Sequence, residues 1–370
     1  MFTNIILFRI NFNILNTKIW YAIGLMSGTS LDGVDIAYVK FSNSEHNGMD
    51  SWEFAILSAK TYAYSDTWLS KLKDAFYYNK EDLSKIDVEY GTYLSGLLNQ
   101  FRKEKNITKL DFIASHGHTI HHKPDEGYTL QIGNGDIIAK NTKIKTIYDF
   151  RTQDVALGGQ GAPLVPIGDQ LLFANYTYCL NLGGFANISF QDNNKRVAYD
   201  ICAVNTVMNH YANKLGLNYD DEGNIAKSGE LNLKLLEKLN NLAFYKAAYP
   251  KSLGIEFVNE NLFKIIDSFN LEIKDILHTF VEHIAIQITN NLVNNGNLLI
   301  TGGGAFNTYL INRIKALSSN KISLPNKNII DYKEALIFAF LGVLRIENKV
   351  NCLKSVTGAS KDHSTGVVCL

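Results

Sequence analysis

A short polar turn near the N-terminus carries the residues best suited to bind phosphate. Between two apolar segments, Tyr21–Leu25 and Val34–Val39, the chain reads Met-Ser-Gly-Thr-Ser-Leu-Asp-Gly. Glycines permit backbone angles closed to other residues, so a tight turn can aim several amide groups at one anion. The hydroxyls of Thr29 and Ser30 add donors, and the carboxylate of Asp32 could hold a phosphate-bound metal ion. The turn predicts a phosphate-binding hairpin, with an ordinary glycine-containing hairpin as the alternative.

The pattern around this turn differs from the commonest phosphate-binding loop. The chain has no Gly-x4-Gly-Lys-[Ser/Thr] motif, and a strand rather than a helix follows the turn. A hairpin that grips phosphate between two strands resembles instead the superfold shared by actin, sugar kinases and heat-shock ATPases. That resemblance predicts an α/β fold with mixed sheets, two domains and an interdomain cleft.

Composition restricts the compartment and the partners. The 370 residues are enough for two domains with substantial cores. The 36 Lys and Arg residues balance 36 Asp and Glu residues, so no global charge favours nucleic acid or an acidic membrane. The four cysteines are far apart and form no Cys-x-x-Cys pair, which favours reduced thiols over a disulfide scaffold or a zinc ribbon. No segment is long and apolar enough to span a bilayer, so we expect a cytoplasmic protein without nucleic-acid or membrane partners.

The regular pattern of strands begins at about Lys18. Residues 1–17 are apolar but interrupted by Asn and Arg, and they lack the basic leader and small-residue cleavage site of a signal peptide. We expect 1–17 to be an extension, 18–176 to form an N-terminal domain and 177–370 to form a C-terminal domain.

Several strands of the first half end in polar residues. The strand Asp111–Ser115 leads into Ser-His-Gly-His-Thr-Ile-His-His, and Tyr128–Ile132 leads into Gly-Asn-Gly-Asp. The histidine spacing matches no helical zinc motif, so it favours polar contacts at a strand end, where α/β sheets place their ligand loops. His121 and His122 are expected to face solvent. A glycine-rich loop, Leu157–Pro166, opens a helix and is the predicted floor of a ligand cleft.

The second half repeats the pattern of strands and glycine-rich turn seen in the first. A strand, Tyr178–Leu182, is followed by the turn Gly-Gly-Phe-Ala-Asn and a returning strand, Ile188–Gln191. The next strand, Val197–Tyr199, ends at Asp200, and a helix follows from Asn205. This echo is typical of a fold with two related halves.

Two further segments complete the second half. A long helix, Lys274–Val293, places six apolar residues on one face: Leu277, Phe280, Val281, Ile284, Ile288 and Leu292. The strand Leu298–Thr301 ends in three glycines that allow a ligand to approach the backbone closely. Glu334–Glu347 is the last predicted helix, and it is expected to pack back on the first domain.

These segments together closely resemble the anhydro-N-acetylmuramic acid kinase family, in one register from about Trp20 to the C-terminus. The motifs that carry the resemblance are Gly24-Leu-Met-Ser-Gly-Thr-Ser-Leu-Asp-Gly-Val-Asp35, Ser115-His-Gly117, Gln131-Ile-Gly-Asn134, Asp149-Phe-Arg151, Gly159-Gln-Gly-Ala-Pro-Leu-Val-Pro166, Asn181-Leu-Gly-Gly-Phe-Ala-Asn187, Gly302-Gly-Gly-Ala-Phe-Asn307 and Val356-Thr-Gly-Ala359. Each motif is unspecific alone, but the set is highly specific.

The resemblance implies an actin-like, ribonuclease H-like kinase of cell-wall recycling. It would use ATP and Mg²⁺ to convert 1,6-anhydro-N-acetylmuramic acid to N-acetylmuramic acid 6-phosphate, with Asp200 as the catalytic base. The implied ATP-binding residues are Gly28, Thr29, Ser30, Leu31, Asp32, Gly33, Val34, Asp35, Gly302, Gly303 and Gly304, with Asp32 also holding the metal. The candidate contacts to the sugar and its lactyl group are Ser115, His116, Gln131, Asn134, Arg151 and Gln160.

Two positions depart from the family pattern. The family commonly reads Asp-x-Gly-Pro-x-Asn after the catalytic aspartate, whereas this chain reads Asp-Ile-Cys-Ala-Val-Asn from Asp200 to Asn205. The missing glycine and proline put the local backbone contact to phosphate in doubt, but not the base. His118 stands where the family often has Gln, which leaves its role open.

Two alternative functions are also compatible with the sequence. A kinase of another small sugar or acid could use the same fold, since fold does not fix function. A nucleotide-switched chaperone or filament protein is a second alternative, although the chain shows no appended peptide-binding domain. A homodimer is a candidate assembly that the sequence does not decide.

Overall fold

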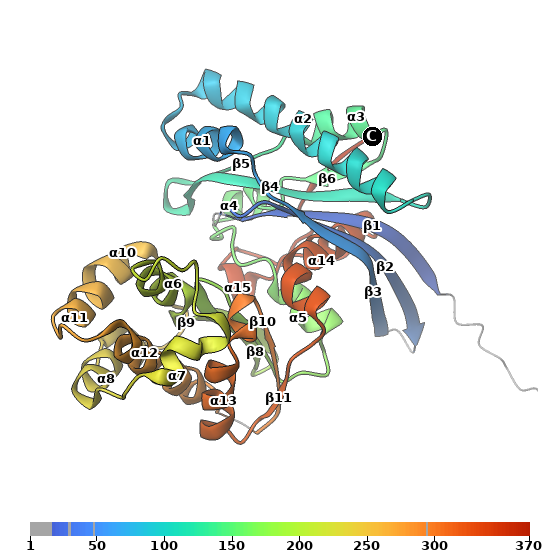
Figure 1. The fold of residues 1–370 in the computed structure, drawn as a ribbon. Helices are drawn as coiled ribbons and strands as arrows, with labels where there is room; N and C mark the ends of the chain where they lie inside the picture. The colour runs from blue at the N-terminus through green and yellow to red at the C-terminus, as the bar shows by residue number, and fades with distance from the viewer. Residues whose placement is uncertain (1–16, 29–30, 47–48, 294) are drawn as a thin grey trace, which may run out of the picture.

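The computed structural model describes residues 17–28, 31–46, 49–293 and 295–370. The expected N-terminal extension, 1–17, therefore lies almost entirely outside the described residues. Figure 1 shows two α/β halves stacked on one another, each built on its own sheet. Among the described residues, no helix is both long and apolar enough to cross a bilayer.

The first sheet joins the N-terminal strands to the last strand of the chain. Strands β1, β2 and β3 form an antiparallel meander, β4 lies parallel to β1, and β6 lies parallel to β4. In spatial order the strands are β12 (Val367–Cys369), β6 (Thr146–Tyr148), β4 (Phe112–Lys123), β1 (Lys18–Ser27), β2 (Val34–His46) and β3 (Met49–Tyr62), and β5 (Tyr128–Ile132) pairs with β4 off this path.

The second sheet has the same arrangement. A meander of three antiparallel strands is again followed by two parallel strands on the side of its first member. In spatial order the strands are β11 (Lys321–Ser323), β10 (Asn297–Thr301), β7 (Tyr178–Leu182), β8 (Phe185–Asp192) and β9 (Lys195–Ala203). The repeated topology confirms the expectation of two related halves, and the predicted two-domain actin-like α/β fold is the fold of this chain.

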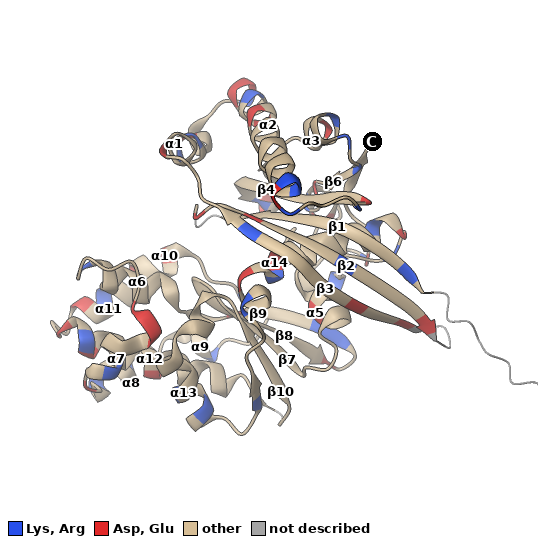
Figure 2. Ribbon diagram, turned by 45° about the vertical axis from the view of Figure 1, so that its right-hand side comes forward, with Lys and Arg blue, Asp and Glu red and all other residues tan. Residues whose placement is uncertain are grey.

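Helices cover both sheets. The first half carries α1 (Asp66–Asp74), α2 (Lys80–Glu104), α3 (Gly135–Thr142), α4 (Thr152–Ala156) and α5 (Pro166–Leu172). The second half carries α6 (Asn205–Asn213), α7 (Asn224–Ser228), α8 (Leu233–Asn240), α9 (Ala243–Lys246), α10 (Ile255–Phe257), α11 (Phe263–Asp267), α12 (Ile273–Asn290) and α13 (Thr308–Leu317). The predicted apolar face of α12 is confirmed: its five helical members are fully buried. Figure 2 shows basic and acidic residues on both halves, with neither sign confined to one of them.

One helix links the two halves. Helix α14 (Lys327–Ile346) lies against β1, β2 and β4 of the first sheet, and it also contacts β10 of the second. Its approach to β1 requires a glycine, because a Cβ on Gly24 would lie 1.9 Å from the carbonyl oxygen of Ala335. The ring of Phe340 packs 5.0 Å from that of Trp52. Since β12 also pairs with β6, we propose that the halves divide near residue 176 and that the C-terminal segment returns to the first half.

Several predicted boundaries were wrong, and three of the differences bear on the site. Strand β4 does not stop at Ser115 but continues through the histidines to Lys123, because β5 supplies a pairing partner for that polar stretch. Strand β9 continues past Asp200 to Ala203, because its last three residues are buried in the core. Helix α14 begins at Lys327 rather than Glu334, with the side chain of Asn326 capping the amide of Ile329.

We predict that Gly24→Ala destabilises the protein by about 1–3 kcal/mol or more, because the added methyl group collides with the backbone of α14. The matched control is Gly96→Ala on the exposed face of α2, where an added Cβ meets no atom within 4 Å. Since alanine favours a helix over glycine by about 1 kcal/mol, the control should keep or raise the melting temperature. Equal melting temperatures for both variants would contradict this packing of α14.

Candidate active site

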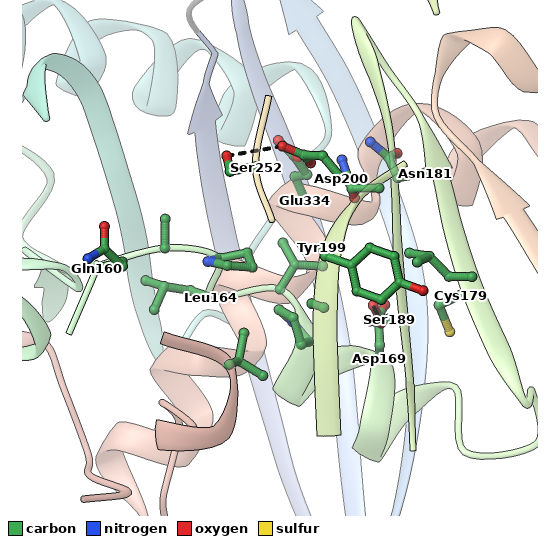
Figure 3. Close-up of a pocket in the computed structure, with 18 of the residues that line it drawn as sticks. Gln160, Leu164, Asp169, Cys179, Asn181, Ser189, Tyr199, Asp200, Ser252 and Glu334 are labelled. Atoms are coloured by element: carbon green, nitrogen blue, oxygen red, sulfur yellow. Dashed lines mark hydrogen bonds between the residues drawn. The ribbon is translucent and has the colours of Figure 1, made fainter. Parts of the chain in front are cut away.

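A cavity of about 610 Å³ lies between the two halves. This volume is in the range of small-molecule sites. Both halves contribute to its wall: Arg151, Gln160 and the loop Ala162–Pro166 from the first, and Asn181, Asn187, Asp200 and Ser252 from the second. Helix α14 adds Lys333, Glu334 and Phe338. Figure 3 shows the labelled residues around this space, with Gln160 on one side and Asp200 on another.

A β-bulge in β9 sets the direction of the Asp200 side chain. Asn187 on β8 pairs with Asp200, but the next pair is Ala186 with Cys202, so Ile201 is an extra residue. A bulge bends the strand and re-aims the neighbouring side chain. Ile201 and Cys202 are both fully buried and anchor the distorted strand in the core. Cys202 and the equally buried Ala203 stand where the family commonly has Gly and Pro, so both departures have a packing role here.

Two hydrogen bonds fix the Asp200 carboxylate. The amide of Leu253 donates to Oδ2 at 2.8 Å. The hydroxyl of Ser252 donates to the same oxygen at 3.2 Å, as Figure 3 shows. No hydrogen bond to Oδ1 is found among the described residues. Burial raises the pKa of Asp200, and these two donors partly offset the rise. A held carboxylate with a raised pKa and one free oxygen facing a cavity can act as a general base.

Arg151 presents a cation to the cavity. Its Nε donates to Nε2 of His116 at 3.0 Å, and its Nη1 donates to the carbonyl oxygen of Gly161 at 2.6 Å. Burial lowers the pKa of Arg151 to about 10, so the guanidinium stays charged at neutral pH. Because His116 Nε2 accepts from the arginine, its Nδ1 is the nitrogen that donates to the Gly117 carbonyl. The donors that Arg151 has left can bind a carboxylate.

The cavity wall also contains charged residues that were not predicted from the sequence. Glu334 is a carboxylate of α14 that is exposed at the cavity, where desolvation by the surrounding wall raises its pKa while Arg151 and Lys333 oppose the rise. Lys333 pairs with Asp169 of α5 at 2.7 Å. The signal in the sequence is Lys333 at the start of the apolar run Ala-Leu-Ile-Phe-Ala-Phe-Leu, where a buried charge needs a partner.

The base of the polar hairpin rests on a buried hydroxyl network. Ser27 Oγ lies 2.5 Å from the Tyr64 hydroxyl and 3.0 Å from Nδ1 of His118, and the Tyr90 hydroxyl donates to it at 2.9 Å. Burial lowers the pKa of His118 to about 4, so the imidazole is neutral at pH 7. This places His118 beneath the hairpin, and it is not among the residues that line the cavity.

The hairpin itself is only partly described. Thr29 and Ser30 lie outside the described residues. Leu31 has a positive φ of 60°, and a Cβ on Gly33 would lie 2.4 Å from the Tyr62 carbonyl oxygen. Asp32 is exposed, whereas Asp35 is half-buried and accepts a hydrogen bond from Thr61 at 2.5 Å. Burial raises the pKa of Asp35 to about 6, with Glu334, Asp331 and Asp32 adding to the rise.

The glycines after β10 are required by packing. Gly302 has a φ of 81°, and a Cβ there would lie 2.7 Å from Oδ1 of Asn181. A Cβ on Gly304 would lie 2.7 Å from Cβ of Leu182. The close approach of this turn to β7 therefore explains both glycines without a ligand, and their contact with ATP stays a prediction.

Besides His116 and Arg151, three further predicted sugar contacts are engaged within the protein. Ser115 is fully buried and accepts from the Gly117 amide. Gln131 donates to the hydroxyls of Thr119 and Thr129. Asn134 caps α3 by accepting from the amide of Ile137, while its amide donates to Asp87. Arg151 and Gln160 reach the cavity, whereas Ser115, His116, Gln131 and Asn134 are not among its lining residues.

Comparison with known proteins gives one consistent family. The family model described as anhydro-N-acetylmuramic acid kinase matches residues 20–370. The chain is 36% identical to the anhydro-N-acetylmuramic acid kinase of Hydrogenovibrio crunogenus, over 94% of this chain and 97% of that protein. It is 35% identical to that of Mannheimia succiniciproducens, over 94% and 98%. Among solved structures, the activator of 2-hydroxyisocaproyl-CoA dehydratase from Clostridium difficile is a distant match. It aligns with a TM-score of 0.42 and 13% identity, over 88% of this chain and 97% of that one.

We predict that Ser252→Ala raises the pKa of Asp200 further, because it removes a donor that stabilises the charged carboxylate. Carboxyl-resolved NMR titration of Asp200 measures this directly. Ser228→Ala is the control, since that hydroxyl bonds only to the carbonyl of Ile225 and should leave Asp200 unchanged. A lower pKa in Ser252→Ala would refute the assigned hydrogen bond.

Proposed function

The chain belongs to the anhydro-N-acetylmuramic acid kinase family, and we propose that it opens and phosphorylates 1,6-anhydro-N-acetylmuramic acid with ATP. The product is N-acetylmuramic acid 6-phosphate, in the recycling of peptidoglycan. The family match from residue 20 to the C-terminus supports this activity. A cytoplasmic location and a homodimer accompany the proposal as predictions.

The observation that carries the mechanism is the Asp200 carboxylate at the wall of the cavity. The anhydro sugar has no free 6-hydroxyl, because O6 is bonded to C1. Water must therefore attack C1 while the C1–O6 bond breaks, and Asp200 takes the proton that the water loses. O6 leaves with its electron pair and bonds to the γ-phosphorus of ATP, and ADP departs. Transfer to phosphorus captures the leaving oxygen, so no separate acid is needed there.

Arg151 and Gln160 are the proposed contacts to the lactyl side of the sugar. Arg151 is a charged, oriented guanidinium at the cavity wall, and a bidentate pair with the lactyl carboxylate suits its geometry. Ser115, His116, Gln131 and Asn134 remain proposed contacts. Closure of the cleft would be needed to bring them to a ligand, and closure also excludes water that would hydrolyse ATP.

The polar hairpin and the turn after β10 are the proposed nucleotide contacts. The residues of the hairpin are Gly28 to Asp35, and those of the turn are Gly302 to Gly304. The hairpin fits a magnesium ion by its chemistry: Asp32 and Asp35 offer hard oxygen ligands, and neighbouring carboxylates help to raise the pKa of Asp35. Magnesium, when bound, neutralises charge on the transferring phosphoryl group. Ser27 and the network beneath it hold the hairpin in place.

We expect Asp200→Asn to fold and bind ATP but to lose about 10²–10⁴-fold in turnover, as is usual when a general base is removed. In the parent protein, kcat/KM should fall as the pH drops through the raised pKa of Asp200, because the protonated carboxyl cannot accept a proton. The residual activity of Asp200→Asn should lack this acid limb. Near-normal turnover of the folded variant would remove Asp200 from the role.

Turnover in ¹⁸O-water should place the label at C1 of the product and leave the phosphate ester unlabelled, because O6 comes from the substrate. The anomer formed first should be inverted, since a single displacement offers no covalent intermediate. The product must be read within the first turnovers, before ring opening of the free sugar exchanges the label. Early ¹⁸O label in the phosphate group, with none at C1, would contradict the coupled mechanism.

A further inference from the structure

A buried cluster outside the cavity combines a carboxylate, a thiol and an imidazole. Asp154 of α4, Cys352 and His363 are 0%, 1% and 6% exposed. Cys352 Sγ lies 3.0 Å and His363 Nε2 lies 3.5 Å from Oδ1 of Asp154. The three ligand atoms lie within 4.8 Å of one another. Nothing in the proposed mechanism uses these residues.

The fold holds the three side chains in place from several directions. Cys352 and His363 form an antiparallel bridge with two backbone hydrogen bonds of 3.1 Å. The side chain of Asn351 bonds to the backbone of Thr365 as donor and acceptor, which closes the loop that carries both residues. Oδ2 of Asp154 accepts from the Gly161 amide at 2.7 Å. The cluster is therefore preorganised rather than a chance encounter of mobile side chains.

The imidazole of His363 has an unsatisfied nitrogen that faces the carboxylate. Its Nδ1 lies 3.1 Å from the carbonyl oxygen of Lys361, which can only accept, so Nδ1 is the protonated nitrogen. Nε2 then carries a lone pair, is buried and has no hydrogen-bond partner among the residues that the structure describes. Its nearest charged neighbour is a carboxylate oxygen, which is also an acceptor. That oxygen already accepts hydrogen bonds from the Cys352 thiol and the Thr357 hydroxyl, so a metal ion between it and Nε2 would take the place of the thiol proton.

We propose that Asp154, Cys352 and His363 bind a zinc ion. Thiolate, imidazole and carboxylate are the ligands zinc prefers, and a ligating histidine usually donates its other N–H to a carbonyl, as His363 does to Lys361. One thiolate and one carboxylate neutralise Zn²⁺, so the buried complex carries no net charge. Binding displaces the Cys352 thiol proton to solvent. The fourth position falls to water or to the hydroxyl of Thr357, which lies 2.8 Å from Oδ1 of Asp154.

The proposed ion would fasten the C-terminal segment to the wall of the cavity. Asp154 lies three residues after Arg151, and the amide of Gln160 donates to the Thr357 carbonyl at 2.8 Å. Zinc would thus stabilise the loop that carries two cavity residues while standing outside the reaction itself. The metal-free alternative is a second proton on His363, which would pair the imidazolium with Asp154. A direct metal measurement distinguishes the two: it would detect bound zinc, whereas a second proton would leave no metal to detect.

The experiment uses the full chain, produced without an affinity tag in zinc-supplemented medium and dialysed. Metal analysis should find about one zinc per chain in the parent protein, as for other closed protein sites. Cys352→Ser and His363→Gln should each lose most of the zinc. The matched control is Cys369→Ser, a second buried cysteine that lies on β12 and outside the cluster, which should keep it.

Cobalt replacement provides a readout that does not depend on activity. The parent protein and Cys369→Ser, stripped of zinc and loaded with Co²⁺, should show a thiolate-to-cobalt charge-transfer band, and Cys352→Ser should lack it. If Cys352→Ser fails to fold, the parent protein still decides: chelation should lower its melting temperature, and zinc should restore it. Trace zinc with no cobalt band in the parent, or an unchanged band in a folded Cys352→Ser, would overturn the proposal.

Discussion

The arrangement of the cavity depends on a buried ion pair between Asp169 and Lys333. Asp169 lies on α5 and Lys333 on α14, and both side chains are only 5% exposed. Ser189 on β8 donates to the other oxygen of Asp169 at 2.5 Å, and Arg196 on β9 donates to Ser189 at 2.7 Å. The network thus binds two helices to the second sheet at the wall of the cavity. Breaking a buried pair by removing one partner typically costs about 3–5 kcal/mol, because the other charge is left uncompensated.

This network gives α14 its double attachment. The apolar face of the helix packs on the first sheet, where Gly24 lets the backbones approach, and its polar start is held to the second half through Lys333. Glu334, the next residue, lines the same cavity as Asp200 and Arg151, which come from opposite halves. The ion pair thereby sets the position of one carboxylate relative to groups that are far apart in the sequence. Surface pairs such as Lys18 with Glu347 are solvent-screened and contribute little by comparison.

Burial, more than charge pairing, tunes the acids near the cleft. It is the largest cause of the raised pKa values of Asp200, Glu334 and Asp35. Each environment then adds its own correction: hydrogen bonds for Asp200, cations for Glu334 and other carboxylates for Asp35. These differing environments are consistent with the different roles that we propose for the carboxylates, a base at the sugar and metal ligands at the phosphates. The half-buried guanidinium of Arg151 adds a positive charge to the cavity wall, as the proposed binding of an anionic lactyl group requires.

The sequence by itself determined the family, the two related halves, the hairpin and the position of Asp200 at the second sheet. These features depend on local patterns, in which strand alternation and turn residues act over a few positions. It did not determine that the histidine stretch continues β4, because β5 must pair with it, or that β9 runs on beyond Asp200. The engagement of Ser115 and Asn134 inside the first half was equally invisible. Only the tertiary structure brought Asp169 to Lys333, and Asp154 to Cys352 across 198 positions, because packing of distant elements decides which buried charges and thiols meet.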